Sequence, residues 1–600
     1  MSHRSRTKGK DVSRKMSQTS RTKGTNLSHD STPVERLLQD DGVSRTEVAN
    51  VSREVSRRNW LKFGTAGAAG AALYRGLKTL LVRPGFDLVS FIAGAAVASS
   101  YKELATSGIL PSSGNPQAVD AGRLDEVHES LGRWIYLTPQ KLGGGTHCVD
   151  LSTGKTLAWI SYWNYGDTCP ISHHVAAYPS DDPYSGFEFV NSTQGGDNVL
   201  IYGIPTRIKK LGLLDPWYGQ GNRIYRVHFD GAQMNLMEDI SQSTGIGLGV
   251  HTVIYPDANG FACADGQKDV CAFFNRARGT EKTGVLMAFR ADWSARNKDS
   301  LERCWSDGGT LRLTRLSPAK ETGTYDYEGT KGNKINWEMV PMAESLVYRG
   351  QLPGAAPREL TGLDAVVHHP NNRWSVLVLR MPAAAIIIDR QSWEPVCCLH
   401  TPEGSPSNLP VKKVASGPNV WEVEFDDCKC VAHEAGFTPD GKFFTMMNNI
   451  AQNNMPIFDT SDPDPRKWKK VTFVKDSKWV GEYPSPFHLC FSVDGSKMFV
   501  SVLYPKPANS SSVVVDTKTW KIIKKFENVG PDCQTMAVTY DGKYVLQIFS
   551  GFQRLSSGLF VYTQDTLEPV GYLPNFGGHH DCVVVPTKVE HLLNSRCTTL

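Results

Sequence analysis

From about residue 130 onward, the chain alternates short apolar runs with turns rich in Gly, Asp, Asn and Pro. The runs are four to eight residues long and rich in β-branched and aromatic side chains, as at residues 385–389 and 513–516. Runs of this length bounded by turn residues are typical of β-strands, and helical periodicity is scarce. The pattern therefore predicts an all-β fold.

The same strand-and-turn unit recurs seven times, with Phe437-Thr438-Pro439-Asp440-Gly441 as its clearest copy. The last strand residues before the seven turns serve as anchors: Ala177, Ile254, His368, Phe437, Phe491, Val538 and Val584. Successive anchors are 77, 114, 69, 54, 47 and 46 residues apart, and the last two spacings are those of a propeller blade. The repeat predicts a seven-bladed β-propeller over residues 125–600, with insertions in the longer units.

Two features refine this architecture. The longest gap holds a Pro-, Gly- and charge-rich stretch at residues 318–334, and inserted loops of this kind commonly build a functional mouth. An open ring would leave an unpaired edge. We therefore expect a strand from residues 130–160 to pair with the last blade.

The N-terminal 123 residues show no such repeat. Residues 1–55 are basic, rich in Ser and Thr and nearly free of aromatics, so they predict a disordered extension. Arg57-Arg58 then opens a weakly apolar Gly/Ala-rich stretch, which over residues 56–98 indicates a twin-arginine export signal cleaved near Ala98. An uncleaved membrane anchor is the alternative, although four charged residues interrupt the stretch. Residues 99–124 are a predicted linker.

Charge and cysteine content narrow the class of protein. The whole chain carries a formal net charge of +4, but residues 1–60 contribute +6 and residues 61–98 contribute +3, which leaves about −5 after cleavage. The basic balance therefore belongs to the leader and does not predict a nucleic-acid partner. The 13 cysteines lack paired Cys-x-x-Cys spacing, and in an oxidising compartment we expect some of them to form disulfides.

Ligand-capable side chains stand at one position of the repeat. They lie four residues before the anchor at His173, Asp364, His433, Gln534 and His580, and three residues before it at His251 and His488. One structural position repeated around a ring brings its side chains to the common axis, so the pattern predicts a metal site there. Imidazole-rich sets favour copper or zinc, and this set exceeds the needs of one tetrahedral ion. The alternative is a structural role in which each imidazole caps backbone groups.

The adjacent-histidine strings at residues 171–179 and 578–581, with the leader and the seven units, resemble the thiocyanate dehydrogenase family. That family is related to the propeller domain of nitrous oxide reductase. The resemblance covers about residues 125–600 and implies three copper ions that oxidise thiocyanate with water to cyanate and elemental sulfur. It implies copper ligands at His173, His251, His433, His488 and His580.

The resemblance also implies substrate-side groups: Lys141, His174, Glu338 and Asp364. Gln534 is a further candidate because it stands at the repeated position. Asp364 is expected to be a ligand or to orient water. Glu338 is the candidate general base, or else an exposed loop acid, and Lys141 attracts the anion or is a surface lysine. Gln534 donates to the substrate or bridges blades, and His579 supports the ligands. Because Asp364 and Gln534 stand where histidines would continue, a compact sulfide-bridged cluster is not expected.

Partners and alternatives complete the prediction. Two electrons must leave to an external acceptor, for which a periplasmic cytochrome c is the expected partner. The sequence leaves open whether the chain forms a homodimer. The alternative functions are a related copper propeller acting on another small molecule and a non-catalytic exported binding or scaffold protein.

Overall fold

The computed structural model describes residues 124–595 with gaps, the longest of which are 194–222, 296–307 and 327–362. Residues 1–123 and 596–600, and with them the predicted extension, export signal and most of the linker, lie outside the described residues. All described residues belong to one compact unit, Phe86–Leu600. Among them, no helix is both long and apolar enough to span a bilayer.

The described strands form seven antiparallel sheets, which we number as blades along the chain. Blade 1 holds β4 (Ser172–Ala177), β5 (Phe187–Thr193), β6 (Arg223–Phe229) and β7 (Met234–Asp239). Blade 2 holds β8 (His251–Ile254), β9 (Gly260–Asp265), β10 (Val270–Asn275), β11 (Val285–Ala295), β12 (Gly309–Pro318), β13 (Tyr325–Asp326), β19 (Lys412–Lys413) and β20 (Val420–Phe425). Blade 3 holds β14 (Leu363–His368), β15 (Trp374–Leu379), β16 (Ala384–Asp389), β17 (Glu394–His400) and β18 (Asn408–Leu409).

The remaining blades have four strands each. Blade 4 holds β21 (Val431–Phe437), β22 (Phe443–Asn449), β23 (Met455–Asp459) and β24 (Lys469–Val474). Blade 5 holds β25 (Ser485–Phe491), β26 (Lys497–Leu503), β27 (Asn509–Asp516) and β28 (Lys521–Pro531). Blade 6 holds β29 (Cys533–Val538), β30 (Tyr544–Phe549), β31 (Ser557–Thr563) and β32 (Pro569–Asn575). Blade 7 holds β33 (Val583–Val584), β1 (Ile135–Gln140), β2 (Gly145–Asp150) and β3 (Lys155–Ser161).

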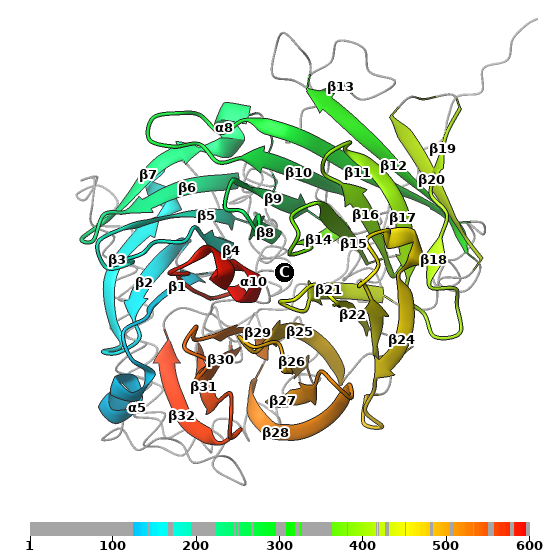
Figure 1. Ribbon diagram of the computed structural model, residues 1–600. Helices are drawn as coiled ribbons and strands as arrows, with labels where there is room; N and C mark the ends of the chain where they lie inside the picture. Colours follow the sequence, from blue (N-terminus) through cyan, green and yellow to red (C-terminus); the bar gives the residue numbers. More distant parts are fainter. Residues whose placement is uncertain are drawn as a thin grey trace, which may run out of the picture. The chain divides into compact units, whose positions relative to one another are not determined.

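The first strand of every blade lies innermost, and the inner strands contact one another in a closed circuit (Figure 1). The circuit runs from β4 through β8, β14, β21, β25 and β29 to β33, which contacts β4 again. Each of the seven predicted anchors is the last residue of one of these inner strands. The all-β propeller prediction is therefore confirmed, with seven blades among the described residues.

Blade 7 closes the ring with strands from both ends of the chain. In the register of β1 and β33, Tyr136 pairs with Val584 and Leu137 with Val583. The predicted pairing of residues 130–160 with the end of the chain is thus confirmed. C-terminal β33 is the inner strand of a blade whose other three strands are N-terminal.

The long insertion enlarges a blade. Strands β11 and β12 extend blade 2 outward, and β20, which follows blade 3 in the chain, pairs with β12 from Gly309↔Phe425 to Thr314↔Val420. Blades 2 and 3 are therefore held together by strand exchange as well as by packing. The described part of this insertion lies at the blade edge (Figure 1), away from the inner strands.

The repeated turn has a local cause that the sequence shows directly. In blade 4, Gly441 donates its N–H to the Thr438 carbonyl at 2.8 Å and has a φ of 71°. Gly495 and Gly542 occupy the same position in blades 5 and 6, with φ of 69° and 73°. A side chain at such a φ is strained, so the glycine of the motif is a backbone requirement.

The inner strands define two ends of the ring. We call the end at which they begin the upper end and the end at which they finish in the repeated turns the lower end. The C-terminal segment, with η6 (Val589–His591) and α10 (Leu592–Ser595), lies at the lower end. There His591 stacks on Tyr540 of blade 6, and Asn594 donates to the Ser492 carbonyl of blade 5 at 3.0 Å. The other short helices are α5 (Leu124–Leu131), η2 (Tyr162–Tyr165), α8 (Ile240–Thr244) and η4 (Pro465–Lys467).

Eight described cysteines are free thiols, and all are buried. The expected disulfides are therefore not formed by these eight. Burial raises the pKa of the Cys397 thiol to about 12, with the nearby Asp464 carboxylate adding to the effect. Such thiols are inert and act as small apolar core residues.

Candidate metal centre

The inner strands are irregular at the predicted site positions. In β4, the register passes from Ser172↔Thr193 to His174↔Ser192, so His173 is an extra residue. Shifts of the same kind leave Asp364 extra in β14 and Phe487 extra in β25. In β21 the two residues His433 and Glu434 stand opposite one residue of β22, and in β29 Gln534 and Thr535 stand opposite one residue of β30. A β-bulge changes the direction of the side chains it contains and is common beside functional sites. Five blades thus carry a bulge at or next to the predicted position.

Three histidine rings from blades 1 and 2 pack together at the upper end. The ring centroids of His173 and His174 are 4.5 Å apart, and those of His174 and His251 are 4.3 Å apart. The His173 and His251 centroids are 6.0 Å apart. The side chains are buried, with exposures of 6% for His173, 0% for His174 and 1% for His251. Such a cluster of imidazoles is costly to bury unless the rings have polar or metal partners.

A buried glutamate links this cluster to blade 5. Oε1 of Glu434 lies 3.5 Å from Nε2 of His251 and 3.5 Å from Nδ1 of His488. Glu434 is 0% exposed and His488 is 1% exposed. His488 is further held by its backbone N–H, which donates to Ser501 Oγ at 3.0 Å. The predicted residues His251 and His488 thus belong to one buried group although two blades separate their strands.

A buried aspartate holds His174 from the C-terminal side. Oδ2 of Asp581 lies 3.3 Å from Nδ1 of His174 and accepts the N–H of Val175 at 3.0 Å, while Oδ1 accepts the N–H of Cys582 at 2.8 Å. Asp581 is 0% exposed. It therefore joins the segment entering β33 to the strand that carries His173 and His174.

The structure brings together His173, His174, His251 and His488 of the predicted set. Asp364, His433 and Gln534 lie on described inner strands, but the structure describes only their backbone. Lys141, Glu338, His579 and His580 lie outside the described residues altogether. The roles assigned to these seven residues stay predictions.

Sequence reasoning missed Glu434 and Asp581. Each directly follows a predicted ligand, His433 or His580, and that adjacency was the available signal. Strict strand alternation turns neighbouring side chains to opposite faces, so the pattern predicts only one residue of each pair at the site. The bulge at His433 and Glu434 removes that restriction.

Within the described side chains, no three His, Cys, Asp or Glu groups are placed to hold a metal ion. Three of the six predicted ligands, Asp364, His433 and His580, are not among these side chains. The described groups are four buried imidazoles and two buried carboxylates, and imidazole donors suit copper or zinc. The residues present therefore fit a metal of this kind, and His433, Asp364 and His580 stay predicted ligands.

Other histidines are structural. His369 donates from Nε2 to the Gly441 carbonyl at 3.0 Å, and this bond ties the turn of blade 3 to that of blade 4. His128 likewise bonds the Leu151 carbonyl at 2.7 Å. A structural role of the kind considered for the repeat histidines therefore occurs in this protein at His369 and His128.

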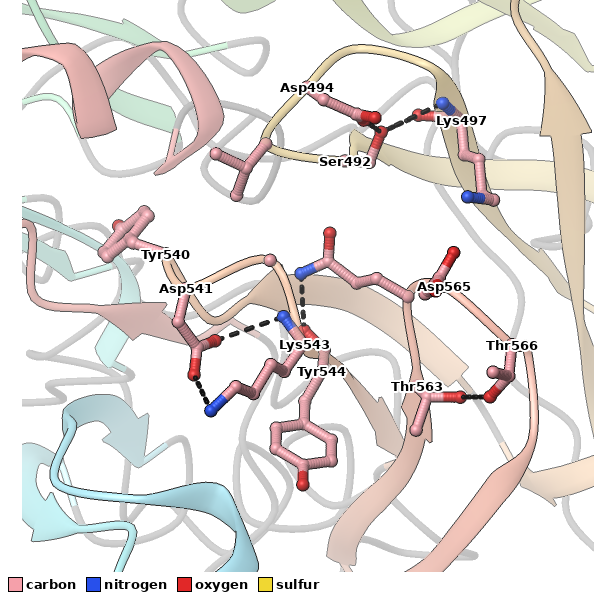
Figure 2. Close-up of a pocket in the computed structure, with 13 residues that line it drawn as sticks. Ser492, Asp494, Lys497, Tyr540, Asp541, Lys543, Tyr544, Thr563, Asp565 and Thr566 are labelled. Atoms are coloured by element: carbon pink, nitrogen blue, oxygen red, sulfur yellow. Dashed lines mark hydrogen bonds and ion pairs between the residues drawn. The ribbon is translucent and has the colours of Figure 1, made fainter.

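A cavity of about 700 Å³ lies at the lower end, between the turns of blades 5 and 6 (Figure 2). Its carboxylates stabilise turns: Asp494 accepts from Ser492 Oγ at 2.6 Å, and Asp541 accepts the N–H of Lys543 at 3.1 Å. Figure 2 shows these side chains directed at their own turns. This cavity is thus separate from the histidine cluster, and both of these carboxylates already accept hydrogen bonds within their own turns.

One buried histidine outside the cluster gives a prediction for acid stability. Burial lowers the pKa of His147 on β2 to about 4, although the residue as a whole is only partly buried. Between pH 6.5 and 4 the unfolded chain therefore binds a proton that the folded chain does not, so stability falls as pH falls, by at most about 3 kcal/mol. His147→Phe should remove this contribution, and urea unfolding at pH 7 and pH 5 checks it. An equal loss of stability in both proteins between these pH values would contradict the assignment.

The fold and the cluster together define a β-propeller with buried histidines and carboxylates gathered at one end of its inner strands. No protein-family model matches the chain, and no curated protein matches it. Solved structures share its architecture at low identity. Dihydro-heme d1 dehydrogenase NirN in complex with DHE is 12% identical, with 80% of this chain and 78% of that chain covered and a TM-score of 0.39.

Two further structures show the same level of likeness. Apo AztD from Citrobacter koseri is 9% identical, with 76% of this chain and 98% of that chain covered and a TM-score of 0.39. The β-propeller domain of Cps50 (Swd1) from Myceliophteria thermophila is 11% identical, with 71% and 93% covered and a TM-score of 0.37. Likeness at this level carries no functional argument, and the architecture rests on the chain's own sheets.

Proposed function

We propose that this protein is a copper-dependent oxidoreductase of the periplasm that oxidises thiocyanate. Thiocyanate and water would give cyanate, elemental sulfur, two protons and two electrons. The observation that carries the proposal is the packing of His173, His174 and His251 into one buried cluster at the upper end. A scaffold propeller has no need to gather these rings in one place, whereas a multi-copper site needs several imidazole donors close together.

Copper would be held by His173, His251, His433, His488, His580 and Asp364. When bound, it supplies positive charge that polarises the thiocyanate carbon and accepts the two electrons. The nitrogen-rich donor set supports copper over metals that favour oxygen ligands. An external acceptor, for which a periplasmic cytochrome c is the natural class, would then remove the electrons.

The chain's own residues would bind the anion and move protons. Lys141 attracts thiocyanate, and Gln534 donates a hydrogen bond to it. Glu338 takes the proton of the attacking water, which Asp364 orients if it is not itself a ligand. His174 carries a proton from the site. Asp581 lies beside its Nδ1, so Nε2 is the ring nitrogen that faces away from this carboxylate and can exchange a proton.

The test is copper content by mass spectrometry together with thiocyanate-dependent reduction of a dye acceptor. Two to three copper ions per chain with turnover would support the proposal. Copper without turnover would point to a different small substrate. A folded protein that takes up no copper would contradict the proposal and favour a scaffold.

A further inference from the structure

Glu434 occupies a position that no predicted role explains. It is one of the two residues of the β21 bulge, next to His433, and its side chain is fully buried. A buried carboxylate is costly unless it accepts hydrogen bonds from its neighbours. His251 and His488 each lie 3.5 Å from the same oxygen of Glu434, Oε1.

The two histidines present different nitrogens to Glu434. His251 presents Nε2 and His488 presents Nδ1. Both contacts are at the long end of hydrogen-bond distance. An ionised carboxylate accepts and does not donate, so in the arrangement proposed below each of these nitrogens carries a proton and donates it to Glu434. The opposite nitrogens, Nδ1 of His251 and Nε2 of His488, are then the ones with a lone pair for a metal.

Such an arrangement has a known physical effect at metal centres. A histidine that donates its second ring N–H to a carboxylate is fixed in tautomer and orientation, and its ligating nitrogen becomes more basic. One carboxylate acting on two ligands ties their orientations together. Here the two ligands come from blade 2 and blade 5, and the carboxylate comes from blade 4.

We propose that Glu434 is a positioning residue that orients His251 and His488 for copper through their opposite ring nitrogens. This inference rests on the proposed copper site. In this scheme Glu434 selects the ligating nitrogen of His251 and of His488. The role is the same whichever small anion is oxidised. Glu434 does not touch the substrate in this scheme.

The experiment compares Glu434→Gln and Glu434→Asp with the full-length wild-type protein. Copper affinity is measured by competition with a chelator, and the Cu(II) environment by electron paramagnetic resonance. Glu434→Gln keeps the shape but replaces one acceptor oxygen by a donor, so copper affinity should fall about 10- to 100-fold and the spectrum should change. Glu434→Asp keeps both acceptor oxygens and should recover part of the affinity.

Glu238→Gln is the matched control. Glu238 is also a buried carboxylate, but it lies on β7, where it accepts from Thr283 Oγ1 at 2.8 Å and pairs with Arg226 at 3.6 Å. Its substitution should lower stability and leave copper affinity and the spectrum unchanged.

The outcomes separate the two hypotheses. Wild-type protein that binds copper, with Glu434→Gln showing the same affinity and spectrum, would overturn the positioning role alone. Wild-type protein that binds no copper would overturn the proposed function and this inference with it. A loss of affinity in Glu434→Gln as large as in Glu238→Gln would also overturn the inference, because the effect would then follow from any buried carboxylate.

Discussion

His251→Ala should abolish thiocyanate oxidation, by about 10³-fold or more, which corresponds to roughly 4 kcal/mol of lost transition-state stabilisation. The reason is the central place of this ring: it packs against His174 at 4.3 Å and lies 3.5 Å from Glu434, and it is a predicted copper ligand. Removing it takes away one nitrogen donor and one of the histidines beside the buried carboxylate. Copper content should fall by at least one ion per chain.

The variant should remain folded, because the backbone of β8 keeps its register with β9 from His251↔Ala264 to Ile254↔Phe261. Circular dichroism checks that the fold is retained. Dye-reduction kinetics and copper analysis check the loss of turnover and of metal. His228→Ala is the control, since His228 lies near the lower end of β6, opposite Glu188. Full copper content and turnover in His251→Ala would remove this histidine from the site.

Asp581→Ala should destabilise the protein by about 2–5 kcal/mol, since each buried donor left without its acceptor costs about 1–3 kcal/mol. The carboxylate accepts the N–H groups of Val175 and Cys582, and it is fully buried. It joins the chain just before β33 to β4, so its loss weakens the contact between the closing blade and blade 1. Chemical denaturation measures the change in the free energy of unfolding.

A matched control is Asp541→Ala at the lower end. Asp541 accepts the hydroxyl of Thr539 at 2.7 Å and the backbone N–H of Lys543 at 3.1 Å, but Asp541 and Lys543 are exposed, so water can replace the carboxylate at that N–H. Its loss should cost about 1 kcal/mol, the scale of an ordinary hydrogen bond. If Asp581→Ala cost no more than Asp541→Ala, the closing role of Asp581 would be wrong.

Asp581→Asn separates the structural role from the role beside His174. The amide has the same size and can still accept one backbone N–H through its oxygen, but its nitrogen is a donor. If Asp581 orients His174, this variant should lose more turnover than stability, and the pH dependence of kcat should change.

The repeat could be predicted from the sequence because turn chemistry is local. Gly441, Gly495 and Gly542 need a positive φ, which few other residues tolerate, and the strand that precedes each of them is marked by its apolar run. The closing pair of β1 and β33 was also predictable, because an unpaired edge is unfavourable in any ring of blades. The blade 2 extension was not, since β12 and β20 are separated by a whole blade in the chain.

The sequence by itself determined the propeller, its seven inner strands and the register at which His173, His251 and His488 stand, because short-range turn and strand preferences encode all of these. Only the tertiary structure decided that Glu434 and Asp581 belong with them. Their partners lie on other blades, and the bulge that lets Glu434 lie beside His433 among the inner strands depends on pairing between β21 and β22. Contacts between residues as far apart as Val175 and Asp581 arise only when the ring closes.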